Sequence, residues 1–159
     1  MCIRDSHNDD ESIGLILNQP TKINLNEILN NIPLSDFPVY IGGPVAKQSL
    51  QFIHTLGNLI PESKQITENI YFGGDFNTIL KLMQDKKITK NEIRFFVGYS
   101  GWGEDQLNTE IQEESWLVES SKDDLCMQYS TPKLWNKIIR NQKSDYAIWV
   151  NMPKDPNLN

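Results

Sequence analysis

The hydrophobic residues follow two kinds of pattern along the chain. Short continuous apolar runs, bounded by glycine, proline or polar residues, predict buried strands. These runs lie at residues 12–18, 37–41, 50–55, 70–72, 93–99, 116–118 and 146–151. Apolar residues at helical spacing predict helices at 25–32, 76–83, 104–113 and 134–139. Because strands and helices mix without a regular βαβ period, the pattern favours a single compact α+β domain with a mixed sheet.

Polar residues mark the ends of these predicted helices. Asn24 and Asp75 each precede an apolar helical face, where a side-chain oxygen can accept the free N–H groups of the first turn. Pro33 is expected to close the first helix. Thr131 followed by Pro132 predicts the start of the last one, since proline fits the first helical position.

The most distinctive segment, residues 94–110, passes from an apolar run through three glycines into the helix predicted at 104–113. A tryptophan lies there between two glycines, which allow close approach of the backbone. Such a tryptophan either plugs a packed site, the more frequent case, or offers a binding platform. We name this junction and the earlier glycine turn as candidate binding surfaces. Their candidate residues are Gly42, Gly43, Gly98, Gly101, Trp102, Gly103 and Gln106.

Ser100 in the same junction is similar to the serine of the nucleophile elbow, Gly-x-Ser-x-Gly, which belongs to serine hydrolases. The register differs, because residue 102 is tryptophan instead of glycine. Both histidines, His7 and His54, precede the serine, whereas the elbow fold places its histidine last. We therefore expect Ser100 to be a turn residue. A hydrolase stays a remote alternative, and no catalytic residue is predicted.

Anion, nucleotide and metal sites are also disfavoured. Glu104 and Asp105 already place negative charge at the start of the junction helix, where an added phosphate would be repelled. The glycine pairs at 42–43 and 73–74 lack the spacing of nucleotide-binding loops. With 2 cysteines and 2 histidines, the chain lacks the ligand spacing of a zinc site. We expect no cofactor and no metal.

Composition and charge narrow the choice of partners. The 159 residues fit one domain, and 38% of them are hydrophobic, as in a folded globule. A formal net charge of −6 repels phosphate backbones and disfavours nucleic acid. A helix face with Lys133, Lys137 and Arg140 is still a candidate for DNA contact, although a solvated face is the more common explanation. Because the apolar runs are too short to cross a membrane, we expect a cytoplasmic protein without a membrane partner.

Four ordered motifs stand out beyond these patterns. They run from Ile13 to Pro20, from Val39 to Val45, from Tyr71 to Asp75 and from Gly98 to Leu107, and the chain closes with residues 151–159. In this order and spacing the motifs resemble the YqgE/AlgH family of bacterial proteins, and the closing segment is similar to the tail of its Bacteroidetes-type members. The resemblance implies a compact α+β fold with a branched mixed sheet. It implies no catalytic residue, substrate or cofactor, and the family's transcriptional-regulator label is a suggestion.

The resemblance begins at His7, whereas family members normally start with a further strand-forming segment. We therefore expect residues 1–6 to be a non-native leader and residues 7–159 to form a single domain that lacks its first strands. Missing strands leave a sheet edge exposed, so we expect poor solubility or edge-to-edge association. For function we expect a non-enzymatic protein that binds a protein or a small ligand. The alternative is a transcriptional regulator that contacts DNA.

Overall fold

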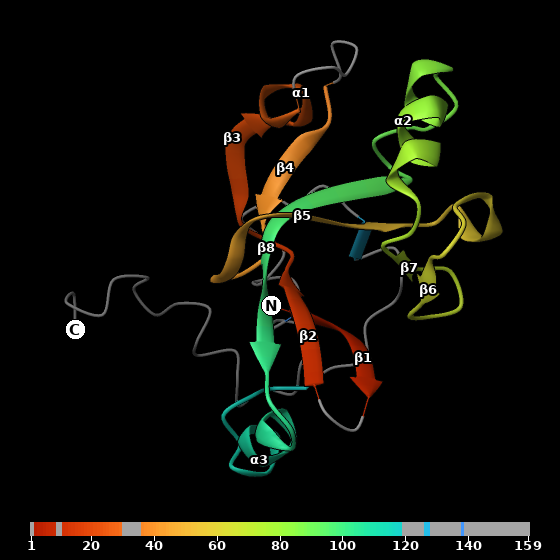
Figure 1. Cartoon of the computed structure of the whole chain (residues 1–159). Helices are drawn as coiled ribbons and strands as arrows, with labels where there is room; N and C mark the ends of the chain where they lie inside the picture. The colour runs from red at the N-terminus through yellow and green to blue at the C-terminus, as the bar shows by residue number, and fades with distance from the viewer. Residues whose placement is uncertain (1, 9–10, 30–35, 119–125, 128–137, 139–159) are drawn as a thin grey trace.

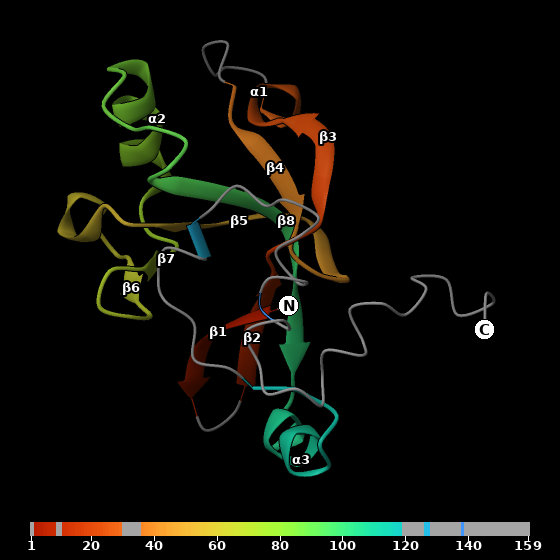
Figure 2. The ribbon, with the colours of Figure 1, turned by 180° about the vertical axis from the view of Figure 1, so that it is seen from behind.

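The computed structural model describes residues 2–8, 11–29, 36–118, 126–127 and 138, with the backbone alone for residues 2–8 and 11. Its elements in chain order are β1 (Cys2–Asn8), β2 (Glu11–Ile16), β3 (Pro20–Asn24), α1 (Leu25–Ile28), β4 (Pro38–Ile41), β5 (Val45–His54), the 3₁₀ turn η1 (Gly57–Leu59), β6 (Lys64–Gln65), β7 (Tyr71–Phe72), α2 (Phe76–Gln84), β8 (Ile93–Trp102) and α3 (Gln106–Gln112). Figure 1 shows this arrangement, and Figure 2 shows it from behind. In this part of the chain no helix is long and apolar enough to cross a membrane.

The strands form one branched sheet of mixed direction (Figure 1). Among the described residues, the 8-stranded sheet has the order β1-β2-β8-β5-β7-β6, with a branch in which β3 pairs with β4 and β4 pairs with β8. The β4–β8 pair is parallel, and the other pairs are antiparallel. The predicted α+β domain with a mixed, branched sheet is therefore confirmed.

The sheet branches along β8. Residues 95–97 of β8 pair with residues 39–41 of β4, whereas residues 100–102 pair with residues 12–14 of β2. Gly98 lies between these two halves with a φ of +70°, a conformation that side chains rarely adopt. The two arms of the sheet, one that contains β4 and one that contains β2, are also joined here. The Gly42 N–H donates to Val97 O over 2.9 Å, and Gly42 O accepts the Ile16 N–H over 2.8 Å. One strand thus serves both arms of the sheet.

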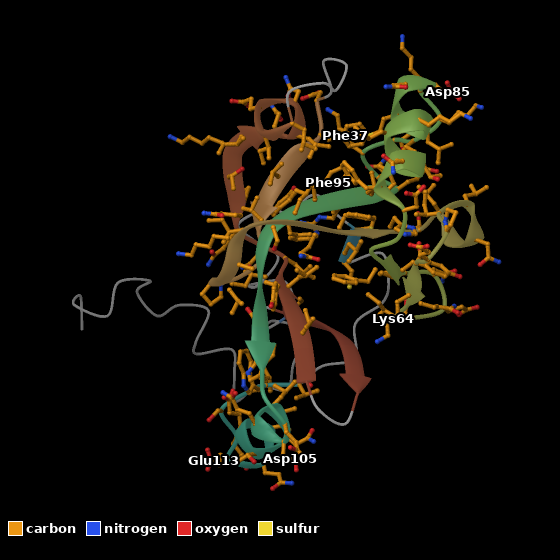
Figure 3. All side chains as sticks on the ribbon, viewed as in Figure 1. Phe37, Lys64, Asp85, Phe95, Asp105 and Glu113 are labelled. Atoms are coloured by element: carbon orange, nitrogen blue, oxygen red, sulfur yellow. The ribbon has the colours of Figure 1, made fainter. Side chains whose placement is uncertain are left out.

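Alternate residues of the central strands pack into two hydrophobic cores, one on each face of the sheet. Phe95 belongs to the first core, where its ring meets that of Phe37 edge to face at 5.9 Å between centroids (Figure 3). Its neighbour Phe96 belongs to the second core. The buried residues of the first core are Leu25, Phe37, Val39, Phe52, Ile60, Ile79, Met83, Ile88, Ile93 and Phe95. Those of the second are Leu15, Leu17, Tyr40, Ile53, Ile70, Phe96, Cys126 and Met127.

A buried arginine crosses the second core. Arg94 of β8 is 0% exposed, and a guanidinium buried so deeply needs hydrogen-bond acceptors. It donates to Leu17 O over 2.8 Å and to Cys126 O over 2.6 Å. It also lies 4.2 Å from the ring centroid of Tyr40, in cation–π geometry. Arg94 therefore ties β8 to the turn after β2, to β4 and to residue 126.

The predicted positions of two helix caps are confirmed. Asp75 is the N-cap of α2, and its carboxylate accepts the N–H groups of Asn77 and Thr78. The Thr78 hydroxyl also donates to this carboxylate, which holds the pKa of Asp75 below its ordinary value. Asn24 is the N-cap of α1, where its N–H donates to Glu27 Oε1 over 2.8 Å.

Three predicted elements have different bounds in the structure. α1 ends at Ile28 instead of residue 32, because Leu29 is already extended. β5 begins at Val45 instead of residue 50, since its first residue already pairs with β8 opposite Tyr99. α3 begins at Gln106 instead of residue 104, because β8 continues to residue 102 through its pairing with β2.

Other predictions were incomplete or wrong. No strand was predicted at 20–24, because Pro20 signals a turn; proline nevertheless fits the first residue of a strand, and β3 starts there. The strand predicted at 116–118 is wrong. Those residues pair with no strand among the described residues, and the Trp116 indole instead bonds to Glu110 of the preceding helix. Most of the helix predicted at 134–139 and the strand predicted at 146–151 lie outside the described residues.

We expect Gly98→Ala to lower the free energy of unfolding by about 3 kcal/mol. The positive φ strains any side chain, and a Cβ at this position would lie 2.7 Å from both Gly43 O and Val45 O. Gly103→Ala is the matched control in the same junction, because a Cβ there meets nothing within 4 Å. We expect the control to change the free energy by less than about 0.5 kcal/mol. Urea unfolding measures both, and similar losses in the two variants would contradict the prediction.

Candidate functional site

Three predicted binding glycines meet at the branch of the sheet. A Cβ on Gly42 would lie 2.2 Å from Gly98 O, and a Cβ on Gly43 would lie 2.2 Å from the carbonyl carbon of Tyr99. Close approach of two backbones excludes a side chain at 42–43, and of these three glycines Gly98 alone has a positive φ. Gly42 and Gly43 are buried and serve packing, so their binding role stays a prediction.

Trp102 fills the end of β8 as a plug. Its side chain is 9% exposed, which leaves little of the indole for a partner to touch. Its ring packs edge to face against Trp116, with centroids 5.7 Å apart and planes at 76°. The structure therefore favours the packing interpretation of Trp102 over the platform, while Gly101 and Gly103 on either side are exposed.

Glu110 of α3 holds the junction together. Its Oε2 accepts the indole N–H of Trp116 over 2.7 Å and that of Trp102 over 3.1 Å. Its Oε1 accepts from Gln106 Nε2 over 2.9 Å, and Gln106 in turn accepts the Gly103 N–H over 3.1 Å. The bond from Trp116, followed by those from Gln106 and Trp102, lowers the pKa of Glu110. Gln106, a predicted binding residue, thus bridges the loop and the helix.

The exposed part of this region lies just after α3. Trp116, Leu117 and Val118 are 39%, 43% and 66% exposed, and we call these three side chains the α3-end patch. Carboxylates precede it in the chain, and no Lys, Arg or His occurs between residues 95 and 118. α3 stands at the far end of β8 from α1 and α2 in both views (Figures 1 and 2), and Figure 3 labels Asp105 and Glu113 at this end. The exposed carboxylates are Glu104, Asp105, Glu113 and Glu114.

The structure separates Ser100 from His54. His54 pairs with Ile93 at the start of β8, whereas Ser100 pairs with Gly14 near its end. At about 3.3 Å per residue, the strand from residue 93 to residue 100 spans roughly 23 Å. His54 is therefore too distant to take a proton from the Ser100 hydroxyl.

His54 has a nearer serine, but its bonds do not suit a general base. Nδ1 accepts the Leu56 N–H over 3.2 Å, which places the ring proton on Nε2. Nε2 lies 2.9 Å from Ser63 Oγ and 3.1 Å from Gly73 O, and donates to them. The Ser63 hydroxyl itself donates to Ile60 O over 2.8 Å. With both ring nitrogens engaged, His54 is a structural histidine.

Two further predictions concern DNA and metal. The face formed by Lys133, Lys137 and Arg140 lies outside the described residues, so its contact with DNA stays a prediction. Within the described part of the chain, no group of three His, Cys, Asp or Glu side chains is placed to hold a metal ion.

Comparison with known proteins identifies the family. The model of AlgH-like proteins, DUF179, matches residues 4–147. The chain belongs to the AlgH-like family. A UPF0301 protein of Parabacteroides distasonis is 36% identical over 155 residues, which cover 96% of this chain and 78% of the relative. A UPF0301 protein of Chlorobaculum parvum is 32% identical over 153 residues, which cover 96% and 82%. The resemblance in the sequence motifs is therefore confirmed.

Solved structures share the AlgH-like fold. The AlgH protein of Pseudomonas aeruginosa superposes with a TM-score of 0.74 at 17% identity, over 97% of this chain and 84% of that protein. Protein DIP2367 of Corynebacterium diphtheriae superposes with a TM-score of 0.68 at 15% identity, over 95% and 81%. At these identities the likeness shows the fold alone.

We expect acid to destabilise this AlgH-like fold through His54. Burial lowers the pKa of the imidazole, an effect that the bond to Gly73 O opposes. The unfolded chain therefore binds a proton, with a pKa of about 6.5, that the folded chain resists. Stability from this group is complete above that pH and falls below it, by up to about 1.4 kcal/mol per pH unit.

The measurement is urea unfolding of the wild type and of His54→Gln between pH 7.5 and pH 5. His7 and the carboxylates titrate in both proteins, so the difference between the two slopes reports His54 alone. We expect the free energy of unfolding to fall less steeply with decreasing pH in the variant than in the wild type. Equal pH dependence in the two proteins would show that His54 does not cause the acid destabilisation.

Proposed function

We propose that this AlgH-like chain is a non-enzymatic module that binds a partner protein at the α3-end patch. The observation that carries the proposal is a run of three consecutive exposed apolar residues, with Val118 exposed to 66%. Single exposed apolar residues are ordinary, but neighbouring ones rimmed by polar groups are typical of a protein–protein contact. The polar groups next to these residues in the chain are the exposed carboxylates of Glu113 and Glu114.

The Trp116 side chain of the patch is also fixed in position before a partner binds. Glu110 fixes the indole N–H of Trp116 over 2.7 Å, and the buried Trp102 supports the ring from behind. Tryptophan is among the residues that contribute most to interface energies, and a pre-ordered side chain loses little conformational freedom on binding. These properties support a recognition surface.

Two observations weigh against catalysis at the junction. His54 is remote from Ser100, and Glu110 uses its oxygens to accept from three donors. Those bonds lower the pKa of Glu110, so it is a weak base and an unsuitable general acid near neutral pH. A cytoplasmic location is part of the proposal, and it is supported by the low number of cysteines, 2 in the chain, which fits a reducing compartment.

We expect Val118→Asp to weaken partner binding at least about tenfold, because it buries a charge in the contact. Leu59→Asp is the matched control, since Leu59 is also 66% exposed but lies in η1, away from the patch. Wild type and both variants are immobilised and exposed to lysate of the bacterium that produces the protein, and captured proteins are quantified by mass spectrometry.

The proposal requires at least one protein that the wild type and Leu59→Asp capture equally and that Val118→Asp loses. Circular dichroism and urea unfolding first establish that both variants are folded. Identical captured sets for all three proteins would rule out the α3-end patch as the contact surface.

A further inference from the structure

We infer that the partner presents a cationic segment, rich in arginine or lysine with an apolar side chain among them, to the α3-end patch. This inference rests on the proposed function and adds the chemical class of the partner. Three features of the patch and its rim carry it: the one-sided charge, the position of the carboxylates on α3 and the held tryptophan.

The charged side chains of residues 95–118, the described segment that carries the patch, have a single sign. Residues 95–118 contain no Lys, Arg or His, although the chain as a whole has 15 Lys and Arg residues. α3 is only about 10 Å long, slightly more than the Debye length of about 8 Å at physiological salt, so the carboxylates before and after it are only partly screened from each other. Their fields add at the patch. An approaching cationic segment is attracted there, while a phosphate backbone or an acidic peptide is repelled.

The carboxylates also occupy the wrong end of α3 for helix stability. Glu110, Glu113 and Glu114 lie in its last turn or just beyond it, and no basic residue occupies that turn. The C-terminal end of a helix carries partial negative charge from its free carbonyls, so carboxylates there are unfavourable and cations favourable. Among the described residues neither Glu113 nor Glu114 forms a salt bridge. A cation from a partner would relieve this repulsion.

Trp116 supplies the apolar and aromatic part of the same recognition. Its side chain remains 39% exposed while Glu110 holds its N–H edge. An indole ring attracts a guanidinium or ammonium group by cation–π interaction, and tryptophan is the strongest of the aromatic side chains in this respect. Leu117 and Val118 beside it offer contact for an apolar side chain of the partner. A segment with both kinds of side chain fits the surface better than a purely basic one.

The test is selection of peptides from a random display library on the immobilised full-length chain, with parallel selection on Val118→Asn, which removes the apolar contact without adding a charge that would attract cationic peptides. Enriched sequences are read out by their net charge and apolar content. The charge-reversed double variant Glu113→Lys/Glu114→Lys tests the rim. Glu62→Lys/Glu68→Lys is the matched control, because these glutamates are equally exposed but lie elsewhere in the fold.

We expect peptides enriched on the wild type, relative to Val118→Asn, to be net positive and to contain an apolar residue. The best of them should bind Glu113→Lys/Glu114→Lys at least about tenfold more weakly and the control variant equally well, with affinity that falls as salt rises. Lysines at the end of α3 suit its C-terminal end, so the reversed variant should unfold no earlier than the wild type, which separates lost binding from lost folding.

The remaining outcomes are distinguishable. Enrichment of neutral or acidic peptides that depend on Val118 would overturn the cationic partner but leave the proposed binding surface intact. Cationic peptides that bind the reversed variant as well as the wild type would also overturn the inference. A failure of Val118→Asn to change the enriched set would remove the patch itself, and with it both proposals.

Discussion

Two backbone segments, residues 42–47 and β8, meet at Gly98 without room for a side chain, and the branched sheet depends on that contact. The segment after β4 lies so close to β8 that a Cβ on Gly42 would be 2.2 Å from Gly98 O. A left-handed φ of +70° at Gly98 bends β8 at the same point. Because interiors are close-packed, the two arms could separate to admit a methyl group only by breaking the bonds that join them. Glycine at positions 42 and 98 therefore allows the two backbones to pack directly against each other.

The same contact also affects how the far end of β8 is paired and how α3 is attached to it. Before Gly98, β8 lies between β4 and β5 and its side chains enter two cores. Beyond Tyr99 it is paired with β2, and the chain continues into the short helix α3. A helix of this length has little stability of its own. It is attached instead by side chains, through the buried ring of Trp102 and its bond to Glu110.

Much of this architecture could be predicted from the sequence where the signal was local. The apolar run at 93–99 predicted the central strand, because a strand buried on both faces is apolar throughout. Asp75 predicted the start of α2, since a cap needs only the residues that follow it. The glycine positions were found, but not their reason, because Gly42 and Gly98 are distant in sequence and their backbone contact exists only in the folded chain.

The failures share the same cause. Trp116 and its neighbours have the composition of a strand, but a strand also needs a neighbouring strand to pair with. The Trp116 indole instead donates a hydrogen bond to the nearby Glu110 carboxylate. Arg94 was visible as a charge inside an apolar run, but its acceptors, Leu17 O and Cys126 O, come from distant parts of the chain. The binding surface predicted at the glycines and Trp102 stays a prediction, and the exposed apolar residues beyond the following helix could not be recognised as exposed from their composition alone.

Glu110 connects the packing of α3 with the proposed binding surface in one side chain. The same oxygen accepts from the buried Trp102 and from the exposed Trp116, so the orientation of the surface indole depends on the packing of the plug. A cation placed on Trp116 would also lie near the Glu110 carboxylate and favour its charged form. Any ligand that binds one state preferentially stabilises it. A partner bound at the α3-end patch would therefore stabilise the attachment of α3 to β8. The sheet would in turn hold the proposed binding surface in its binding conformation.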